Sequence, residues 1–183
     1  MNKELIYIIG GGTLCNFIID IINEIPKYQI AGIFDDNFPQ LNEVAGIKVI
    51  GRFNDIDLNP SRNLVIGIGE PKFRKTFYKE KKKKGFIFPS VIHPQTVISA
   101  NSKIHDGVII GPYTTVLSNT EIGAGTCVLS HVNINHNISI AQFVLIGASV
   151  SIGNGAKIGE GAHISMGKII APQKEINPWE YFK

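Results

Sequence analysis

The apolar positions along the chain follow one rule in the first half and a different rule in the second. A short apolar run, Leu5 to Ile9, predicts a strand that ends at three glycines. Residues 13–25 then carry apolar side chains on one side at helical spacing, and Pro26 predicts the end of this helix. The apolar residues of this helix are Phe17, Ile18, Ile21, Ile22 and Ile25.

Two later apolar runs predict further strands of the same sheet. "QIAGIFDDN" ends in acids, and "NLVIGIG" ends in glycine. After Pro71, "KFRKTFYKEKKKKG" predicts a basic helix that Gly85 closes. Strands and helices in this order indicate a small parallel α/β sheet with a Rossmann-like arrangement.

The second half of the chain follows a six-residue period. From Ile98 to Ile170 every sixth residue is isoleucine or valine, at thirteen consecutive positions. These anchors are Ile98, Ile104, Ile110, Val116, Ile122, Val128, Ile134, Ile140, Ile146, Ile152, Ile158, Ile164 and Ile170. A period of six fits neither an α-helix nor an ordinary strand, but it is typical of the hexapeptide repeat of a parallel β-helix. Three hexads then close a triangular coil, each anchor stacks on the anchor three hexads later, and we expect about four coils between Ile98 and Ile170.

Two other residue classes recur in phase with the anchors. The fourth residue after an anchor is small or β-branched, with Lys168 as the exception, and we expect it to fill a corner of the coil. Glycine follows the anchor directly at several positions, where we expect it to ease tight backbone conformations. The first class comprises Ser102, Val108, Thr114, Thr120, Thr126, Val132, Ile138, Val144, Val150, Ala156 and Ala162, and the glycines are Gly111, Gly123, Gly147, Gly153 and Gly159.

Composition narrows the class of protein. The net charge is +3, and much of the excess lies in "KEKKKKG", which predicts a solvated helix face. No aromatic residues interleave with these lysines and no nucleic-acid motif accompanies them, so we expect no nucleic-acid partner. The two cysteines, Cys15 and Cys127, form no CxxC or zinc spacing. A reduced compartment, no metal, no signal peptide and no membrane insertion are expected, which together favour the cytoplasm.

Four stretches, taken with the repeat, resemble a known family: "IYIIGGG", "IAGIFDDN", "VIGIGEPKFRK" and "FPSVIHPQTVIS". The chain resembles the left-handed β-helix acyltransferases that modify sugars, in particular nucleotide-aminosugar N-acetyltransferases and sialic acid O-acetyltransferases, to about residue 170. The resemblance implies a Rossmann-like α/β domain at residues 1–92 and a left-handed parallel β-helix at residues 93–183. It also implies a homotrimer, a UDP-amino-sugar bound between the two domains, and acetyl-CoA as acyl donor along the coils at a subunit boundary.

The first domain carries candidate nucleotide-binding residues: Gly10, Gly11, Gly12, Asp35, Asp36 and Gly69. Glycine N–H groups at a helix N-terminus can hold phosphate, and carboxylates after a strand can accept from a base N–H or from ribose hydroxyls. Gly69 permits close approach of a ligand. Ordinary turn and cap roles are the alternative. "GGGTLCN" departs from GxGxxG, which weakens a hydride-transfer interpretation.

His136 in "NINHNISI" aligns with the catalytic histidine of the family. An amine that attacks a thioester must lose a proton, and imidazole is a suitable base near neutral pH. Asn137 would orient the ring, and the backbone N–H of Asn154, one coil further on, would stabilise the oxyanion. The alternative is a turn histidine without a catalytic role.

The chain departs from the family pattern on the acyl-donor side. Asn135 and Asn137 replace acids that usually flank the catalytic histidine, and Leu145 replaces a second family histidine. The resemblance places CoA near Leu145, Gly147 and Gly167. The last stretch, "APQKEINPWEYFK", is shorter than in the family, and we expect Trp179 to cap the last coil.

The remaining histidines carry weaker expectations. His93 is expected to fix a turn, and His105 and His163 are expected to be solvated. His131 is unexplained, and it forms no metal site with His136 because no third ligand accompanies the pair.

Taken together, the motifs and the resemblance predict an acetyl-CoA-dependent N-acetyltransferase for a UDP-linked amino sugar in bacterial surface-glycan synthesis. The alternatives are a sugar-nucleotide-binding regulator or partner subunit without efficient transfer, and a sialic acid O-acetyltransferase.

Overall fold

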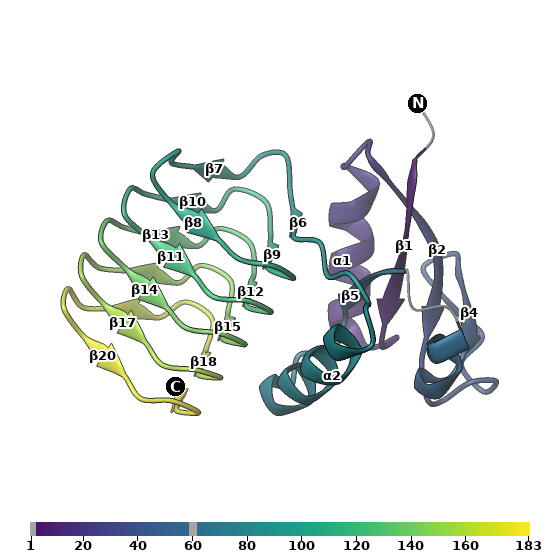
Figure 1. Cartoon of the computed structure of the whole chain (residues 1–183). Coiled ribbons are helices and arrows are strands. Elements are labelled where there is room, and N and C mark those ends of the chain that lie inside the picture. The colour runs from purple at the N-terminus through teal and green to yellow at the C-terminus, as the bar shows by residue number, and fades with distance from the viewer. Residues whose placement is uncertain (1–2, 59–61) are drawn as a thin grey trace. The chain divides into compact units, whose positions relative to one another are not determined.

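The computed structural model describes residues 3–58 and 62–183. The chain divides into two compact units, Met1–Val91 and Ile92–Lys183. Figure 1 shows an α/β unit and a stack of triangular coils. Each unit has its own core, so each is described by itself.

The first unit is built on one five-stranded sheet of order β3-β4-β2-β1-β5. β1 pairs in parallel with β2 and β5, and β2 pairs in parallel with β4. The short β3–β4 pair is antiparallel and was not predicted from the sequence. The strands are β1 (Glu4–Ile9), β2 (Tyr28–Phe34), β3 (Glu43–Val44), β4 (Ile47–Gly51) and β5 (Asn63–Ile66), and the helices are α1 (Thr13–Asn23), the 3-10 helix η1 (Phe53–Leu58) and α2 (Pro71–Lys83).

The predicted periodicity of the first helix is confirmed for three of its five apolar residues, whereas Phe17 is only half-buried and Ile25 lies beyond the helix end at Asn23. α1 buries Ile18, Ile21 and Ile22, as expected, together with Cys15 and Ile19. The other helix, α2, begins with Pro71 and is capped by the Glu70 carboxylate, which accepts from the backbone N–H groups of Lys72 and Phe73. Proline at the first helical position and a carboxylate cap both favour a helix start at this point.

The second unit is a parallel β-helix of two-residue strands. One sheet contains β7 (Val97–Ile98), β10 (Thr115–Val116), β13 (Asn133–Ile134), β16 (Ser151–Ile152) and β19 (Ile169–Ile170). The next contains β8 (Lys103–Ile104), β11 (Glu121–Ile122), β14 (Ser139–Ile140), β17 (Lys157–Ile158) and β20 (Glu175–Ile176). The third contains β6 (Val91–Ile92), β9 (Ile109–Ile110), β12 (Cys127–Val128), β15 (Leu145–Ile146), β18 (His163–Ile164) and β21 (Tyr181–Phe182).

Each anchor pairs with the anchor 18 residues later, as in the register Ile122 to Ile140 and Ile140 to Ile158. The anchors from Ile110 onward form one buried core that also includes Ile176. The partly buried residues Ile92, Ile98, Ile104 and Phe182 pack against this core. Ile176 and Phe182 continue the same spacing beyond Ile170, the last anchor counted in the sequence, and form part of a further coil.

Trp179 is a corner residue of that coil and does not cover it, so the expected cap is also wrong. The ring lies against the corner below, where a side chain added at Gly161 would stand 2.2 Å from Cζ3 of the indole. The backbone N–H of Trp179 donates to the Glu160 carbonyl at 2.8 Å. Because Gly161 has no side chain, the indole of Trp179 can pack against this corner.

From Gly107 onward, each corner contains one residue in the left-handed conformation. Every sixth residue from Gly107 to Trp179 has φ between 58° and 70°, and this residue is the third after the anchor. The glycines that directly follow the anchors serve a different purpose from the one expected. A Cβ at Gly123 would lie 2.6 Å from the backbone carbon of Ala141, so glycine there lets the next coil approach closely.

Candidate functional site

His136 lies in the corner between β13 and β14, and it is exposed. Its backbone N–H donates to Oδ1 of Asn154 at 3.2 Å, and its carbonyl accepts from the Gly155 N–H at 3.1 Å. Within residues 3–58 and 62–183 the imidazole itself has no hydrogen-bond partner. The ring is thus open to an external proton donor, while its backbone is fixed to the next coil.

The Asn137 side chain is bonded to another coil and not to the His136 ring, which it was expected to orient. It is the left-handed residue of this corner, with φ of 60°. Its side-chain carbonyl accepts from Nδ2 of Asn119, one coil earlier, at 3.2 Å. Asn135 likewise donates to the Ile152 carbonyl at 3.0 Å. Both amides are therefore used to tie coils together, and neither is bonded to the His136 ring in the described part of the chain.

Asn154 stands directly above His136, as expected from the coil period. Its side chain accepts from His136 and its carbonyl accepts from the Gln173 N–H at 2.8 Å. Its own backbone N–H has no acceptor among the described residues. A donor next to an exposed imidazole is the pair of groups that acyl transfer from a thioester requires.

The residues expected to hold CoA lie at a different corner from His136. Gly147 follows β15 and Gly167 follows β18, in successive coils; the Gly167 N–H donates to Ala148 at 2.8 Å. A Cβ at Gly147 would lie 2.5 Å from the Met166 nitrogen. Leu145 begins β15 and is half-buried. Within one chain, therefore, the structure brings Gly147 and Gly167 together but does not bring them to His136.

In the first unit, the Asp35 carboxylate is hydrogen-bonded to the glycine turn that was expected to hold phosphate. This buried carboxylate accepts from the Gly11 N–H at 2.7 Å through Oδ2. Its Oδ1 accepts from the backbone N–H of Asn37 at 2.8 Å and from Nδ2 of Asn37 at 2.9 Å. Asp36 accepts from the Phe53 N–H at 3.0 Å. Both acids thus stabilise local backbone in this structure.

The other glycines predicted to bind the nucleotide are Gly10, Gly12 and Gly69. They differ in the space around them and in their hydrogen bonds. Gly10 donates to the Phe34 carbonyl at 2.8 Å, and with φ of 93° it has no room for a side chain beside Ile68. The Gly69 carbonyl accepts from Nη1 of the buried Arg74 at 2.8 Å. Gly12 is exposed with open space around it, and its N–H has no acceptor among the described residues. Of this set, Gly12 at the start of α1 is the open donor.

Replacing Asp35 by alanine is expected to lower the free energy of unfolding by about 1–3 kcal/mol, because the Gly11 and Asn37 donors would lose their acceptor. Urea unfolding measures the change. Asp20→Ala on the exposed face of α1 is the matched control, expected within about 0.5 kcal/mol of the parent protein. An unchanged stability in the Asp35 variant would mean that the carboxylate serves only a ligand.

The cysteines are unsuited to nucleophilic chemistry. Both are buried. Burial, together with the nearby Asp35 carboxylate, raises the pKa of the Cys15 thiol to about 12. Because the thiolate is the reactive form, Cys15 stays inert at neutral pH.

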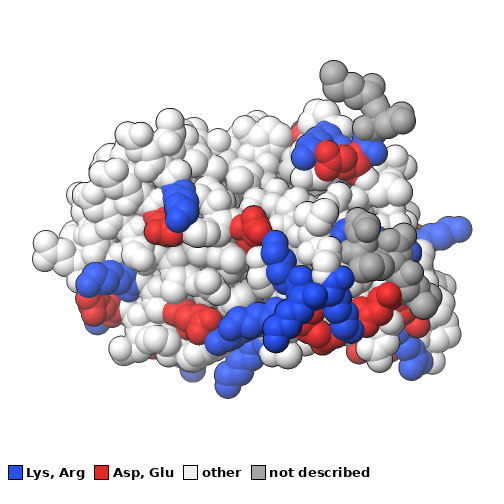
Figure 2. All heavy atoms as spheres, viewed as in Figure 1, with Lys and Arg blue, Asp and Glu red and all other residues white. Residues whose placement is uncertain are grey.

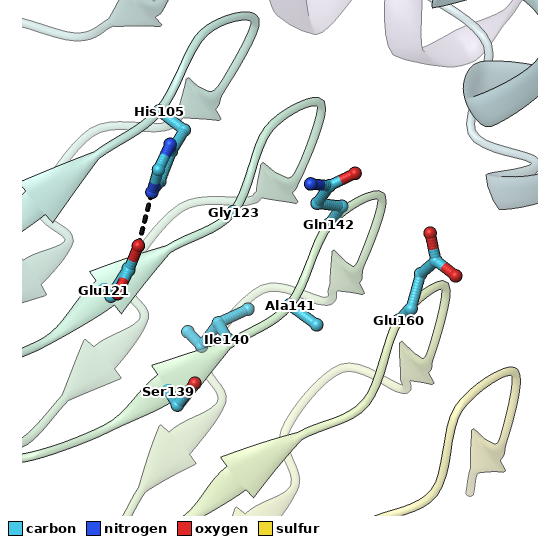
Figure 3. A pocket seen from close by; sticks show the side chains of 8 residues that line it. All are labelled: His105, Glu121, Gly123, Ser139, Ile140, Ala141, Gln142 and Glu160. Carbon is cyan, nitrogen blue, oxygen red and sulfur yellow. Dashed lines mark hydrogen bonds and ion pairs between the residues drawn. The ribbon is translucent and has the colours of Figure 1, made fainter. Parts of the chain in front are cut away.

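Sequence reasoning missed a polar pocket of about 500 Å³ on the β-helix (Figure 3). At one end Nε2 of His105 lies 2.5 Å from Oε1 of Glu121, and Nζ of Lys103 lies 3.3 Å from the same oxygen. The His105 hydrogen bond lowers the pKa of the Glu121 carboxyl, and Lys103 lowers it further. The 18-residue register pairs Lys103 with Glu121, so the coil period was the signal that could have predicted this contact.

The remaining histidines have local roles. His93 Nδ1 accepts from the Gln95 N–H at 3.1 Å, so it fixes a turn as expected. His131 stacks on Tyr113 with ring centroids 4.9 Å apart, and His163 stacks on Tyr181 at 4.5 Å. Among the described residues no group of three or more histidine, cysteine or acidic side chains could hold a metal ion.

No described helix has the length and hydropathy needed to cross a membrane.

Comparisons with known proteins match both units. Residues 5–81 match the family model described as the PglD N-terminal domain, and residues 101–136 match the model described as bacterial transferase hexapeptide (six repeats). A search of curated protein sequences gave no match.

Several solved structures share the fold. A mutant of perosamine N-acetyltransferase from Caulobacter crescentus, in complex with CoA and GDP-perosamine, aligns with a TM-score of 0.88 at 20% identity, over 97% of this chain and 84% of that one. The acetyltransferase domain of PglB from Neisseria gonorrhoeae, in complex with acetyl coenzyme A, gives 0.79 at 19% identity, over 97% and 95%. WeeI from Acinetobacter baumannii gives 0.77 at 19% identity, over 94% of each chain.

These matches confirm the predicted fold, a small α/β unit followed by a left-handed parallel β-helix. They also confirm the resemblance to the left-handed β-helix sugar acyltransferases.

Proposed function

We propose that this chain transfers an acetyl group from acetyl-CoA to the amine of a nucleotide-linked amino sugar. The observation that carries the proposal is the exposed His136 imidazole, one coil from an Asn154 N–H that has no acceptor among the described residues. The structures with the same fold support the donor and the acceptor class, since they contain CoA, acetyl coenzyme A and GDP-perosamine. We propose UDP as the nucleotide of this chain, and the GDP form is the alternative.

In the proposed reaction the amine nitrogen attacks the carbonyl carbon of the thioester directly. His136 accepts the proton that this nitrogen loses, and the Asn154 N–H donates to the oxyanion of the tetrahedral intermediate. The carbon–sulfur bond then breaks, and CoA leaves as the thiol with a proton returned from the imidazolium. Asn137 contributes by fixing the corner through its bond to Asn119.

The placement of the CoA residues supports a homotrimer as the working form. Gly147 and Gly167 lie at one corner of the coil and His136 at another. A second chain could supply the corner that one chain lacks, so that CoA held by one chain would face His136 of its neighbour. We place this activity in the cytoplasm, where acetyl-CoA and sugar nucleotides are available.

A second candidate is a sugar-nucleotide-binding protein without efficient transfer. The absence of an acid beside His136 favours it, because the imidazolium formed during transfer would lack a stabilising charge. Transfer to a hydroxyl of sialic acid is a third candidate, and it demands a stronger base than transfer to an amine.

The test is acetyl-CoA turnover with a panel of UDP- and GDP-linked amino sugars, followed through release of the CoA thiol and the mass of the product. Acetylation of a UDP-linked amine would support the proposal, and acetylation of sialic acid would replace it with O-acetyl transfer. Calorimetric binding of a sugar nucleotide without turnover would favour the binding protein. Neither binding nor turnover would refute the proposal for these substrates.

A further inference from the structure

The positive charge of the chain is concentrated in one helix. Between Pro71 and Lys84, eight residues are lysine or arginine and one is glutamate, which gives this segment a net charge of +7. The whole chain carries +3, so the remainder carries −4. Figure 2 shows lysine and arginine side chains gathered over α2.

Part of this charge serves the fold. Lys81 is buried, with Nζ 2.7 Å from Oδ1 of Asp57, and Lys84 lies 2.7 Å from the other oxygen of the same carboxylate. Glu80 accepts from both lysines, at 3.2 Å and 3.0 Å. These two lysines are thus largely neutralised by neighbouring carboxylates.

Three other lysines form an unpaired row. Lys72, Lys79 and Lys83 are exposed, and none has an ion-pair partner among the described residues. Their spacings of seven and four residues place them on one side of the helix. At 1.5 Å per residue the row extends about 16 Å, which exceeds the reach of a single phosphate and suits an extended anionic surface.

The stability of the helix does not account for this row. Like charges four residues apart, such as Lys79 and Lys83, destabilise a helix. Lys72 lies in the first turn, where a positive charge opposes the helix dipole. Lys83 lies in the last turn, where the helix dipole favours a positive charge. The charge of Lys72 and the repulsion between Lys79 and Lys83 are nevertheless unfavourable for α2, and an anionic partner would reverse the sign of both effects.

Exposed aliphatic side chains lie on the segment that follows α2 and on β1. Ile87 is 52% exposed and Leu5 is 50% exposed. They lie on neighbouring segments, because the Ile87 carbonyl accepts from Leu64 at 2.8 Å and the Leu5 carbonyl accepts from Nδ2 of Asn63 at 3.1 Å. Basic and aliphatic side chains together are typical of segments that bind a membrane surface.

A nucleic acid fits these observations less well. Single strands stack their bases on exposed aromatic rings, but Phe73, Phe77 and Tyr78 of α2 pack into the core of the first unit. We propose that the outer face of α2 docks the protein on an anionic lipid surface. Lys72, Lys79 and Lys83 contact headgroup phosphates, and Ile87 and Leu5 enter the interface.

The test is co-sedimentation of the full chain with vesicles of equal parts phosphatidylcholine and phosphatidylglycerol. The parent protein is expected to bind them, to ignore vesicles of phosphatidylcholine alone, and to dissociate in high salt. Each lysine near such a surface is worth about fivefold in partitioning. The variant K72Q/K79Q/K83Q is thus expected to bind about a hundredfold more weakly, with circular dichroism showing that α2 stays folded.

The matched control is K48Q/K174Q/K183Q, which removes the same charge from three exposed lysines outside α2. It is expected to keep most of the binding. Equal losses in the two variants would overturn the proposal in favour of a general charge effect. Failure of the parent protein to bind the mixed vesicles, or tighter binding to a random DNA duplex than to the vesicles, would also overturn it.

Discussion

Replacing His136 by alanine is expected to lower the rate of acetyl transfer by about a hundredfold or more, because the amine would lose its general base. The structure predicts little accompanying change in stability, since the imidazole is exposed and has no partner among the described residues. Steady-state kinetics with acetyl-CoA and the preferred sugar nucleotide measure the effect. The loss should appear in kcat, because the ring would act on the proton that moves during the reaction.

The matched control is His131→Ala. His131 is also exposed and is also a corner residue, but its ring is stacked on Tyr113. We expect this variant to keep its turnover within a few-fold of the parent protein. If both variants lost activity equally, the loss would not be specific to the proposed base. A fully active His136 variant would leave the fold without its proposed base and would favour the His105–Glu121 pair as the next candidate.

Replacing Ile140 by alanine is expected to lower the free energy of unfolding by about 2–5 kcal/mol, the range for a fully buried aliphatic side chain. Ile140 is 1% exposed and pairs with Ile122 below it and Ile158 above it. The rigid backbone ladders on both sides prevent the coils from closing the cavity. Urea denaturation of the purified variant measures the change.

Ser139→Ala tests whether the effect belongs to the core. Ser139 is in the same strand, but its side chain is exposed. We expect a change within about 0.5 kcal/mol, as for most surface substitutions. Similar losses from both substitutions would show that stability depends on the strand backbone and not on the stacked anchors.

The β-helix could be predicted from the sequence because its rule is local. Each hexad repeats the same residue pattern, and the residue 18 positions after any anchor is its neighbour in the next coil. The count of anchors from the sequence stopped at Ile170, because "APQKEINPWEYFK" contains only two further anchors, Ile176 and Phe182, between charged and exposed residues. In the first unit the same reasoning missed β3 and β4, whose apolar runs are too short to stand out.

The site could be predicted only where it follows the coil period. Asn154 was placed above His136 by counting one coil, and the structure joins them by a hydrogen bond. The contact between Asp35 and Gly11 could not be counted in this way, since it depends on how β1 and β2 pair within the sheet. The pairing of His105 with Glu121 requires side-chain directions that no spacing in the sequence specifies.

Because the register is constant at 18 residues, the length of an insertion or deletion in the β-helix decides which edge of the coil every later residue occupies. An insertion of one whole coil after Asn154 would lengthen the stack and leave every later side chain above the same edge. An insertion of one hexad between His136 and Asn154 would turn every later residue to the next edge and would carry Asn154 away from His136. Related chains should therefore differ in length by whole coils wherever the site is kept.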